Sequence, residues 1–217
     1  VIKLRPTLVL TDGTIGPIDV VEQLRDVGIP VVFVKNESSF AGAASSAEQV
    51  SIALGVPELG KKLANRITTD IDEATKQVSR FVPKDSGKRL RMIFLYIRGD
   101  SGVYYLFGAD SGADDLINAM GGIDVASDMG WAGMKPMTDE ALVKAKPDVI
   151  LTMTDGLEST GGVTGLIDVK PAIALTQAGK NRRIIDMADG DILSFGPRSA
   201  EVVEALARAV YSPGKAS

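Results

Sequence analysis

Two residues that could together bind a metal ion lie two positions apart near the middle of the chain. Tyr96 and Arg98 end an apolar segment, residues 90–98, whose alternating pattern predicts a β-strand. Because alternate side chains of a strand share a face, both should point the same way at the strand end, just before the loop 99–102. A guanidinium beside a tyrosine favours the phenolate form, which binds ferric iron. The ordinary alternative is a half-buried strand tyrosine beside a surface arginine.

Neither cysteine nor histidine occurs in the sequence, and this restricts the available chemistry. Thiolate metal sites, disulfides, the usual zinc sites and the Ser-His-Asp triad are excluded. The commonest protein ligand of haem iron is excluded too, whereas tyrosinate, another recognised ligand, is not. No glycine-rich phosphate-binding motif stands at a strand-to-helix turn, and no carboxylate pair indicates acid–base catalysis. An enzyme is therefore the least supported class of protein.

Other candidates stand where predicted strands end, because ligands of open α/β sheets bind beyond the carboxyl ends of the strands. Met153 directly follows the apolar segment 149–152, and its thioether could pack against a flat apolar ligand. A single methionine more often fills a core. Trp131, Met134 and Met137 lie in a glycine-containing stretch and are candidates for the wall of a cleft.

Several aromatic and acidic residues are expected to be structural. Tyr104 and Tyr105 belong to a predicted strand. Three aspartates near the start of a predicted helix are expected to cap it and to interact with its dipole rather than to bind a cation: Asp110, Asp114 and Asp115.

The bulk composition is that of a globular protein. Among 217 residues, 45% are hydrophobic and 24% are charged. The net charge of −4 offers no basic surface for nucleic acid. The longest apolar runs are far shorter than the roughly 20 residues that a membrane-spanning helix needs. We therefore expect no nucleic-acid partner and no intrinsic membrane span.

A short repeat organises the chain into two halves. Residues 5–11, RPTLVLT, recur as residues 146–152, KPDVILT, and each copy predicts a buried strand entered through a turn. Strands and helices alternate after both copies, which is typical of α/β lobes with mostly parallel sheets. Two further strands and a helix precede the second copy, but almost nothing precedes the first. We therefore expect two similar, Rossmann-like lobes, of which the first is incomplete.

The remaining elements follow from apolar periodicity. Predicted strands cover residues 31–34, 90–98, 103–107 and 183–187, and predicted helices cover residues 17–27, 110–120 and 138–144. A longer helix from Pro57 to about residue 81 is expected to join the lobes stiffly. Its apolar stripe consists of Leu59, Leu63, Ile67, Ile71, Thr75 and Val78. The predicted division is an N-terminal lobe over 1–56, an interlobe helix over 57–82 and a C-terminal lobe over 83–217.

These features together resemble the cluster-III substrate-binding proteins that serve ABC importers of haem, siderophores and cobalamin. The resemblance rests on the repeated strands, the long helix, GGID at 121–124, and SFGPRS at 194–199 leading into a helix that ends at Tyr211. It covers essentially the whole chain. Within this group, FLYIRG at 94–99 is similar to the Tyr-x-Arg strand of haem-binding lipoproteins of the HmuT type.

The resemblance implies roles for individual residues. Tyr96 would be an axial ligand of haem iron, Arg98 would hydrogen-bond to it, and Met153 would line the haem pocket. Relatives of this type carry a second axial ligand, a histidine, on the first lobe. Because this chain has no histidine, the resemblance places that ligand in a missing N-terminal segment. It also implies acidic residues that dock onto the permease, with Glu158 as a candidate.

The expected function is capture of haem (hemin) outside the cytoplasm and its delivery to the permease of an ABC importer for iron acquisition. Haem would be the transported ligand, and haem-donor proteins at the cell surface would be further partners. The expected location is that of a membrane-anchored lipoprotein at the cell surface or of a periplasmic protein. The alternative ligand for the same fold is a ferric siderophore or a corrinoid. A metal-dependent hydrolase or nucleotide enzyme is the weakest alternative.

Overall fold

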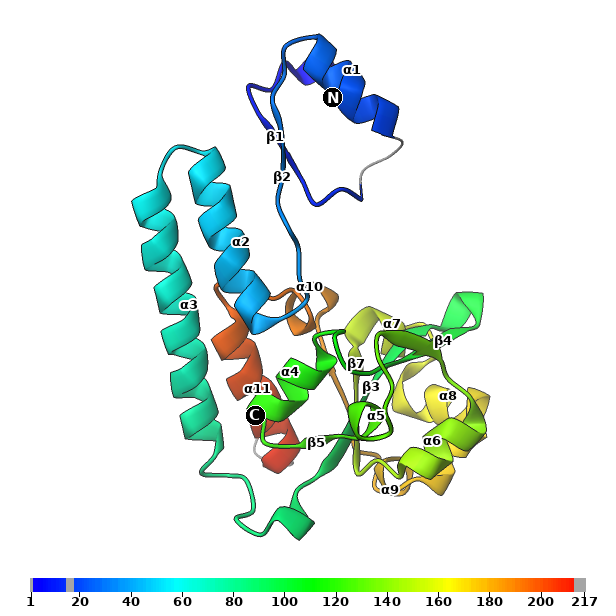
Figure 1. Ribbon diagram of the computed structural model, residues 1–217. Coiled ribbons are helices and arrows are strands. Elements are labelled where there is room, and N and C mark those ends of the chain that lie inside the picture. Colours follow the sequence, from blue (N-terminus) through cyan, green and yellow to red (C-terminus); the bar gives the residue numbers. More distant parts are fainter. Residues whose placement is uncertain (1, 15–17, 213–217) are drawn as a thin grey trace.

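The computed structural model describes residues 2–14 and 18–212. Figure 1 shows three parts in chain order: a small N-terminal unit, a pair of long antiparallel helices, and a larger C-terminal body built around a sheet. The last helix of the body, α11 (Ser199–Tyr211), lies against the long helix α3 (Pro57–Val78). The long helices and the body therefore share an interface.

The N-terminal unit is a small βαβ arrangement. A 3₁₀ turn, η1 (Ile2–Leu4), precedes β1 (Val9–Thr11), α1 (Ile18–Asp26) and β2 (Val31–Phe33), and the two strands pair in parallel. The helix and strand lie close to their predicted bounds, except that residue 17 is outside the described residues. The unit has a small apolar cluster of its own, formed by Val21, Leu24, Ile29 and Val31.

Two helices, and not one, form the long helical part. The predicted long helix is confirmed as α3, with Pro57 in its first turn, and its 22 residues span about 33 Å. A second helix, α2 (Phe40–Ala53), packs along it and was not predicted. The sequence FAGAASSAEQVSIA has mostly small side chains, so it shows no stripe of large apolar residues.

Small residues bring the two helices close together. A Cβ atom at Gly60 would lie 1.8 Å from the Ser51 hydroxyl oxygen of α2, so only glycine fits there. The buried stripe of α3 consists of Gly60, Ala64, Ile67, Ile71, Ala74 and Val78. The predicted stripe is correct for Ile67, Ile71 and Val78, but Leu59 is exposed.

A six-stranded sheet forms the centre of the C-terminal body. Its strands are β3 (Arg91–Arg98), β4 (Val103–Phe107), β5 (Ile123–Asp124), β6 (Met134–Pro136), β7 (Val149–Met153) and β8 (Ile184–Met187). The order is β6-β4-β3-β7-β8, and β5 also pairs with β3. Pairs β3–β5, β3–β7 and β7–β8 are parallel, whereas β3–β4 and β4–β6 are antiparallel.

The sheet is therefore mixed, and the expectation of mostly parallel sheets is wrong for the β4–β6 edge. The reason lies in the short connection between β3 and β4, a 3₁₀ turn η3 (Gly99–Ser101) followed by Gly102 with a φ of +65°. A parallel crossover needs a dozen or more residues, so this turn permits only a hairpin.

Helices cover both faces of the sheet and bury the two sides of β3. Met92 and Phe94 pack with α4, α11 and the end of α3, in what we call the first-face cluster. Ile93 and Leu95 pack with α5, α6, α8 and α9 on the opposite face. The predicted alternation of β3 is thereby confirmed.

The remaining elements of the body are η2 (Ser86–Lys88), α4 (Ala113–Ala119), α5 (Val125–Asp128), α6 (Asp139–Ala145), α7 (Thr154–Glu158), α8 (Gly162–Val169), η4 (Pro171–Leu175), α9 (Gln177–Lys180) and α10 (Asp189–Ile192).

No helix within residues 2–14 and 18–212 combines the length and the apolarity needed to cross a bilayer.

The two copies of the sequence repeat adopt the same local geometry. Arg5 and Lys146 have φ angles of 47° and 48°, which are uncommon for residues other than glycine. Each precedes a proline and then a strand that pairs in parallel with the next strand of its part, β1 with β2 and β7 with β8. The division of the chain at residues 56 and 82 stays a prediction.

The junction between α2 and the body is closely packed. The Phe40 backbone N–H donates to Oδ2 of Asp115 at 3.0 Å, and its ring meets that of Phe195 edge-on, with centroids 5.4 Å apart. A Cβ at Gly112 would lie 2.3 Å from the Phe195 ring. Asp114 accepts from the Gly112 N–H at 3.1 Å. The expected capping role is thus confirmed for Asp114, but it is wrong for Asp115, which bonds to the first residue of α2 instead of its own helix.

The GGID motif provides a turn and a helix cap. Asp124 accepts hydrogen bonds from the backbone N–H groups of Ala126 and Ser127, at 3.1 and 3.4 Å, at the start of α5. Burial raises the pKa of Asp124. A Cβ at Gly122 would lie 2.8 Å from the Met92 side chain, so the turn must pass close to β3.

Thr152 offers a test of how the interior of β7 is packed. Its side chain is fully buried, and its hydroxyl has no hydrogen-bond partner among the described residues. A buried hydroxyl without a partner costs about 1–3 kcal/mol. We expect Thr152→Val to raise the free energy of unfolding, by up to about 2 kcal/mol, in urea denaturation. Thr152→Ser is the matched control, since it keeps the hydroxyl and loses a methyl group, and it should lower stability by about 1 kcal/mol. A valine variant less stable than the serine variant would contradict this account.

Candidate ligand-binding site

Four partly buried side chains form a row across the carboxyl end of the central sheet. Tyr105 of β4 pairs directly with Tyr96 of β3, and Met153 of β7 pairs with Met187 of β8. The last paired residues of β3 and β7 are Phe94 and Leu151, and Tyr96 and Met153 each lie two residues further along their strands. All four pack against the first-face cluster. The structure therefore brings together Tyr96 and Met153, both predicted from the sequence.

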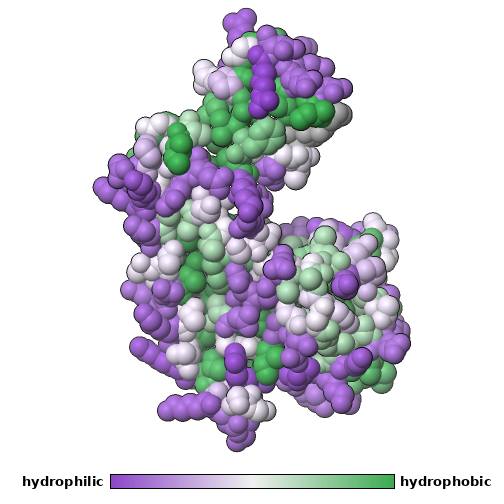
Figure 2. Space-filling model, in the orientation of Figure 1, coloured by the Kyte–Doolittle hydropathy of each residue, from purple (hydrophilic) through white to green (hydrophobic). Residues whose placement is uncertain are grey.

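The row lies on the side of the body that faces the N-terminal unit. The short helices α7 and α10, which follow β7 and β8, occupy this side in Figure 1. Figure 2 shows that the surface is hollowed between the N-terminal unit and the body. The carboxyl end of the sheet thus borders an open space, as expected of a ligand site in an α/β fold.

Tyr96 is held by aromatic and cationic contacts to its ring. The ring stacks on that of Phe107, with centroids 6.0 Å apart and planes 18° apart. The guanidinium carbon of Arg98 lies 4.7 Å from the Tyr96 ring centroid, a cation–π geometry. Within the described residues, no protein group hydrogen-bonds to the Tyr96 hydroxyl, and the side chain is only partly buried. The hydrogen bond between Arg98 and Tyr96 that the resemblance implies stays a prediction.

Arg98 also connects the ends of three neighbouring strands. Its Nη2 lies 3.4 Å from Oδ2 of Asp189, which begins α10 after β8. The other carboxylate oxygen of Asp189 accepts from the Asp155 N–H of α7 at 3.1 Å. The Thr154 hydroxyl donates to Oδ2 of Asp186 at 2.8 Å. These contacts link β3, β7 and β8 at the edge that carries the row.

The end of β3 is fixed by a close approach of α7. The Gly99 N–H donates to the Ser159 hydroxyl at 2.8 Å, and a Cβ at Gly99 would lie 2.7 Å from the Ser159 carbonyl oxygen. A Cβ at Gly156 would lie 2.7 Å from the carbonyl oxygen of Ile97. Side chains at either glycine would push the two segments apart and so would move Tyr96.

The other candidates do not join the row. Trp131 and Met137 pack into the cluster on the opposite face of the sheet, away from Tyr96. Met134 is 62% exposed on the edge strand β6. The structure therefore does not place them on a common wall with Tyr96. Glu158 is exposed at the end of α7, and its contact with a permease stays a prediction.

Three residues of this edge were not predicted as part of a site. Tyr105 was expected to be structural, whereas Met187 and Asp189 were not considered. The rule that identified Met153, a position at the carboxyl end of a predicted strand, applies equally to Met187. The sequence contains no signal for the contact of Asp189 with Arg98, because 91 positions separate them.

The row suits a metal that arrives already chelated. In the described ranges, no group of three or more His, Cys, Asp and Glu side chains is placed to hold an ion. A single tyrosine supplies one oxygen ligand, so the other coordination positions of an iron must be filled by its carrier. The apolar surroundings of Tyr96 and the two thioethers suit a carrier with a flat aromatic surface.

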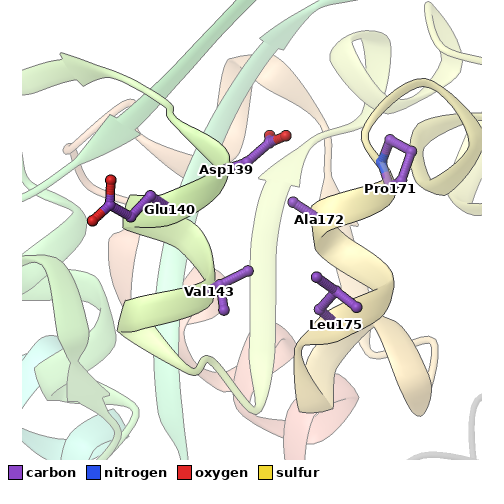
Figure 3. A pocket seen from close by; sticks show the side chains of 6 residues that line it. All are labelled: Asp139, Glu140, Val143, Pro171, Ala172 and Leu175. Atoms are coloured by element: carbon purple, nitrogen blue, oxygen red, sulfur yellow. The ribbon is translucent and has the colours of Figure 1, made fainter.

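Two of the surface hollows in the described part of the chain lie away from the row. Figure 3 shows one, of about 470 Å³ between α6 and η4, where Val143 and Leu175 face each other. The other, of about 390 Å³, lies between α2 and α3 and has mainly apolar walls. Tyr96, Arg98 and Met153 line neither hollow.

The ion pair between Arg98 and Asp189 should contribute little to stability. The two side chains are 41% and 26% exposed, and such pairs are worth less than about 1 kcal/mol. We therefore expect Asp189→Asn, which keeps an acceptor for the Asp155 N–H, to change the free energy of unfolding by less than about 1 kcal/mol. Asp189→Ala loses that acceptor as well and should be less stable than the asparagine variant. Equal destabilisation by both variants in chemical denaturation would show that the charge, and not the backbone contact, matters.

The chain resembles several known proteins along most of its length. The uncharacterized ABC transporter substrate-binding lipoprotein YvrC of Bacillus subtilis (strain 168) is 29% identical over 97% of this chain and 64% of its own length. This chain thus spans less than two thirds of that relative. The crystal structure of the heme-binding protein HmuT is 38% identical, with a TM-score of 0.87, over 97% of this chain and 67% of that one. Three further solved forms of HmuT each have one residue replaced by alanine. The residues are a tyrosine, the arginine two positions after it, and a histidine.

A second solved structure agrees with the first. The periplasmic heme-binding protein RhuT from Roseiflexus sp. RS-1, in its apo form, is 35% identical with a TM-score of 0.86, over 96% of this chain and 77% of that one. Residues 1–189 match the family model described as periplasmic binding protein. The family consists of binding proteins, which confirms the expectation that the chain is not an enzyme. This match, with the solved structures, shows that the chain belongs to the periplasmic binding protein family.

Proposed function

We propose that this chain captures haem outside the cytoplasm and delivers it to an ABC importer for iron acquisition. The observation that carries the proposal is the position of Tyr96 and Arg98 at the carboxyl end of β3, where Tyr96 lies in one row with Met153. The spacing of the pair equals that of the tyrosine and arginine replaced in solved forms of HmuT. Haem in this proposal is the cargo and not a catalytic cofactor.

Tyr96 is proposed as the axial ligand of the haem iron. Its hydroxyl oxygen carries no hydrogen bond from the described residues, and tyrosinate is a known ligand of ferric haem. The guanidinium carbon of Arg98 lies 4.7 Å from the ring centroid, so its positive charge would stand beside an iron-bound tyrosinate. Arg98 is thus proposed to support the iron ligand without binding iron itself.

Met153 is proposed to pack against the haem ring. Its side chain is partly buried against the first-face cluster, next to Tyr96 in the row. A thioether contacts aromatic surfaces favourably and adapts its shape. The flat apolar body of haem would therefore find a matching surface beside the iron ligand.

The proposed partners follow from family and ligand. A permease of an ABC importer would receive the haem, with the exposed Glu158 as a candidate contact on the body. Haem-donor proteins at the cell surface would supply it. The proposed protein is a lipoprotein anchored at the cell surface or a periplasmic protein; the Bacillus subtilis relative is a lipoprotein by name.

A hemin titration followed by visible absorption tests the proposal. Wild-type protein should show the charge-transfer absorption of a phenolate bound to ferric haem. Tyr96→Phe removes only the ligand oxygen, so we expect that absorption to disappear. Loss of an outer-shell partner alone lowers the affinity of a metal site by roughly 10- to 100-fold. Loss of the ligand oxygen should therefore lower the affinity for hemin by at least that factor.

Tyr104→Phe is the matched control, because it removes the same atom from a partly buried tyrosine that packs against the cluster on the opposite face of the sheet. It should keep both the absorption and the affinity. A Tyr96→Phe protein that retains the charge-transfer absorption would refute Tyr96 as the ligand. Failure of wild type to bind hemin, with tight binding of a ferric siderophore or of cobalamin, would replace haem by that ligand.

A further inference from the structure

Met187 occupies a position at the proposed site that matches that of Met153. It ends β8 as Met153 ends β7, and the two are direct partners in the parallel ladder. Both pack against the first-face cluster while remaining partly exposed. Two thioethers therefore lie side by side at the carboxyl end of the sheet.

These two methionines differ from those that fill the core. Met92 and Met120 are fully buried within the first-face cluster. A methionine at a partly exposed strand end is not needed to fill space in the interior. Its apolar surface is available to something that lies against the edge of the sheet.

The position of Met187 is fixed by contacts on both sides of it. The preceding residue, Asp186, accepts a hydrogen bond from the Thr154 hydroxyl at 2.8 Å. Two residues after Met187, Asp189 accepts from the Asp155 N–H and contacts Arg98. The end of β8 is thereby tied to α7 and to β3, so Met187 is held in the same row as Tyr96.

We propose that Met187 contacts the flat ring of the bound ligand and, with Met153, forms a thioether pair that selects a planar aromatic macrocycle. This inference rests on the proposed function and adds a specificity-determining residue to the same site. Neighbouring strands lie about 4.8 Å apart, so Met187, two strands from Tyr96, lies about 10 Å from it along the row. It meets the periphery of a ring whose iron Tyr96 binds.

This contact is independent of the metal. A thioether attracts an aromatic surface through dispersion and polarisability, whatever the centre of the ring contains. Tyr96, in contrast, acts only on iron. An iron-free porphyrin therefore separates the two roles, because it presents the same flat surface without the metal.

The experiment compares hemin with protoporphyrin IX as probes. Binding is followed by quenching of the fluorescence of Trp131, the single tryptophan of the chain, which packs on the other face of the sheet. The variants are Met187→Ala and Met187→Gln; the glutamine keeps the length of the side chain and makes its end polar. Met129→Ala is the matched control, since that methionine is also partly buried but packs against the cluster on the opposite face. Thermal unfolding confirms that each variant is folded.

We expect both Met187 variants to weaken hemin and protoporphyrin IX alike, by about 3- to 10-fold, through loss of apolar contact. Met129→Ala should bind both probes as wild type does. Tyr96→Phe should weaken hemin alone. The inference would be overturned if both Met187 variants bound both probes within about 2-fold of wild type, or if the loss of affinity were confined to hemin. Either result would leave the haem proposal standing. Equal wild-type affinity for the two probes would overturn Tyr96 as an iron ligand, and binding of neither probe would overturn both.

Discussion

The pairing register of β3 with β4 and β7 decides which side chains meet at the carboxyl end of the sheet. Alternate residues of a strand point to opposite faces, so a shift of one residue would turn Tyr96 toward the helices on the other side. Two apolar clusters, one on each face, make such a shift costly, because it would exchange every buried side chain of β3. The hairpin after Arg98 and the close approach of Gly156 to Ile97 then fix the end of the strand. The geometry of the site is a consequence of this register.

The chemistry at that edge is limited by the residues that the chain has. Because this chain has no histidine and no cysteine, any iron ligand that its own side chains supply must be an oxygen, an amine or a thioether. One phenolate cannot hold a free ion, which favours iron that is already chelated. Arg98 places a positive charge beside the ring of Tyr96, and it is itself held by Asp189. A flat apolar carrier matches the thioethers beside Tyr96, and haem combines all of these properties.

The sequence was sufficient for features that depend on local periodicity. The alternation of residues 90–98 placed Tyr96 and Arg98 at one strand end, and the repeat at 5–11 and 146–152 identified two strands with the same entry geometry. It was insufficient where packing between distant segments decides the outcome. Helix α2 consists of small side chains that pack only because α3 has glycine and alanine opposite them. The partners of Arg98 and the faces of Trp131 and Met137 depend on contacts across the fold, which periodicity does not report.

The most direct test of the account is a structure of this chain with hemin bound. We expect the iron to be bonded to the hydroxyl oxygen of Tyr96, the guanidinium of Arg98 to remain beside that residue, and the ring to lie against Met153. An iron bonded to any other residue, or a haem bound in the groove between α2 and α3, would contradict this expectation.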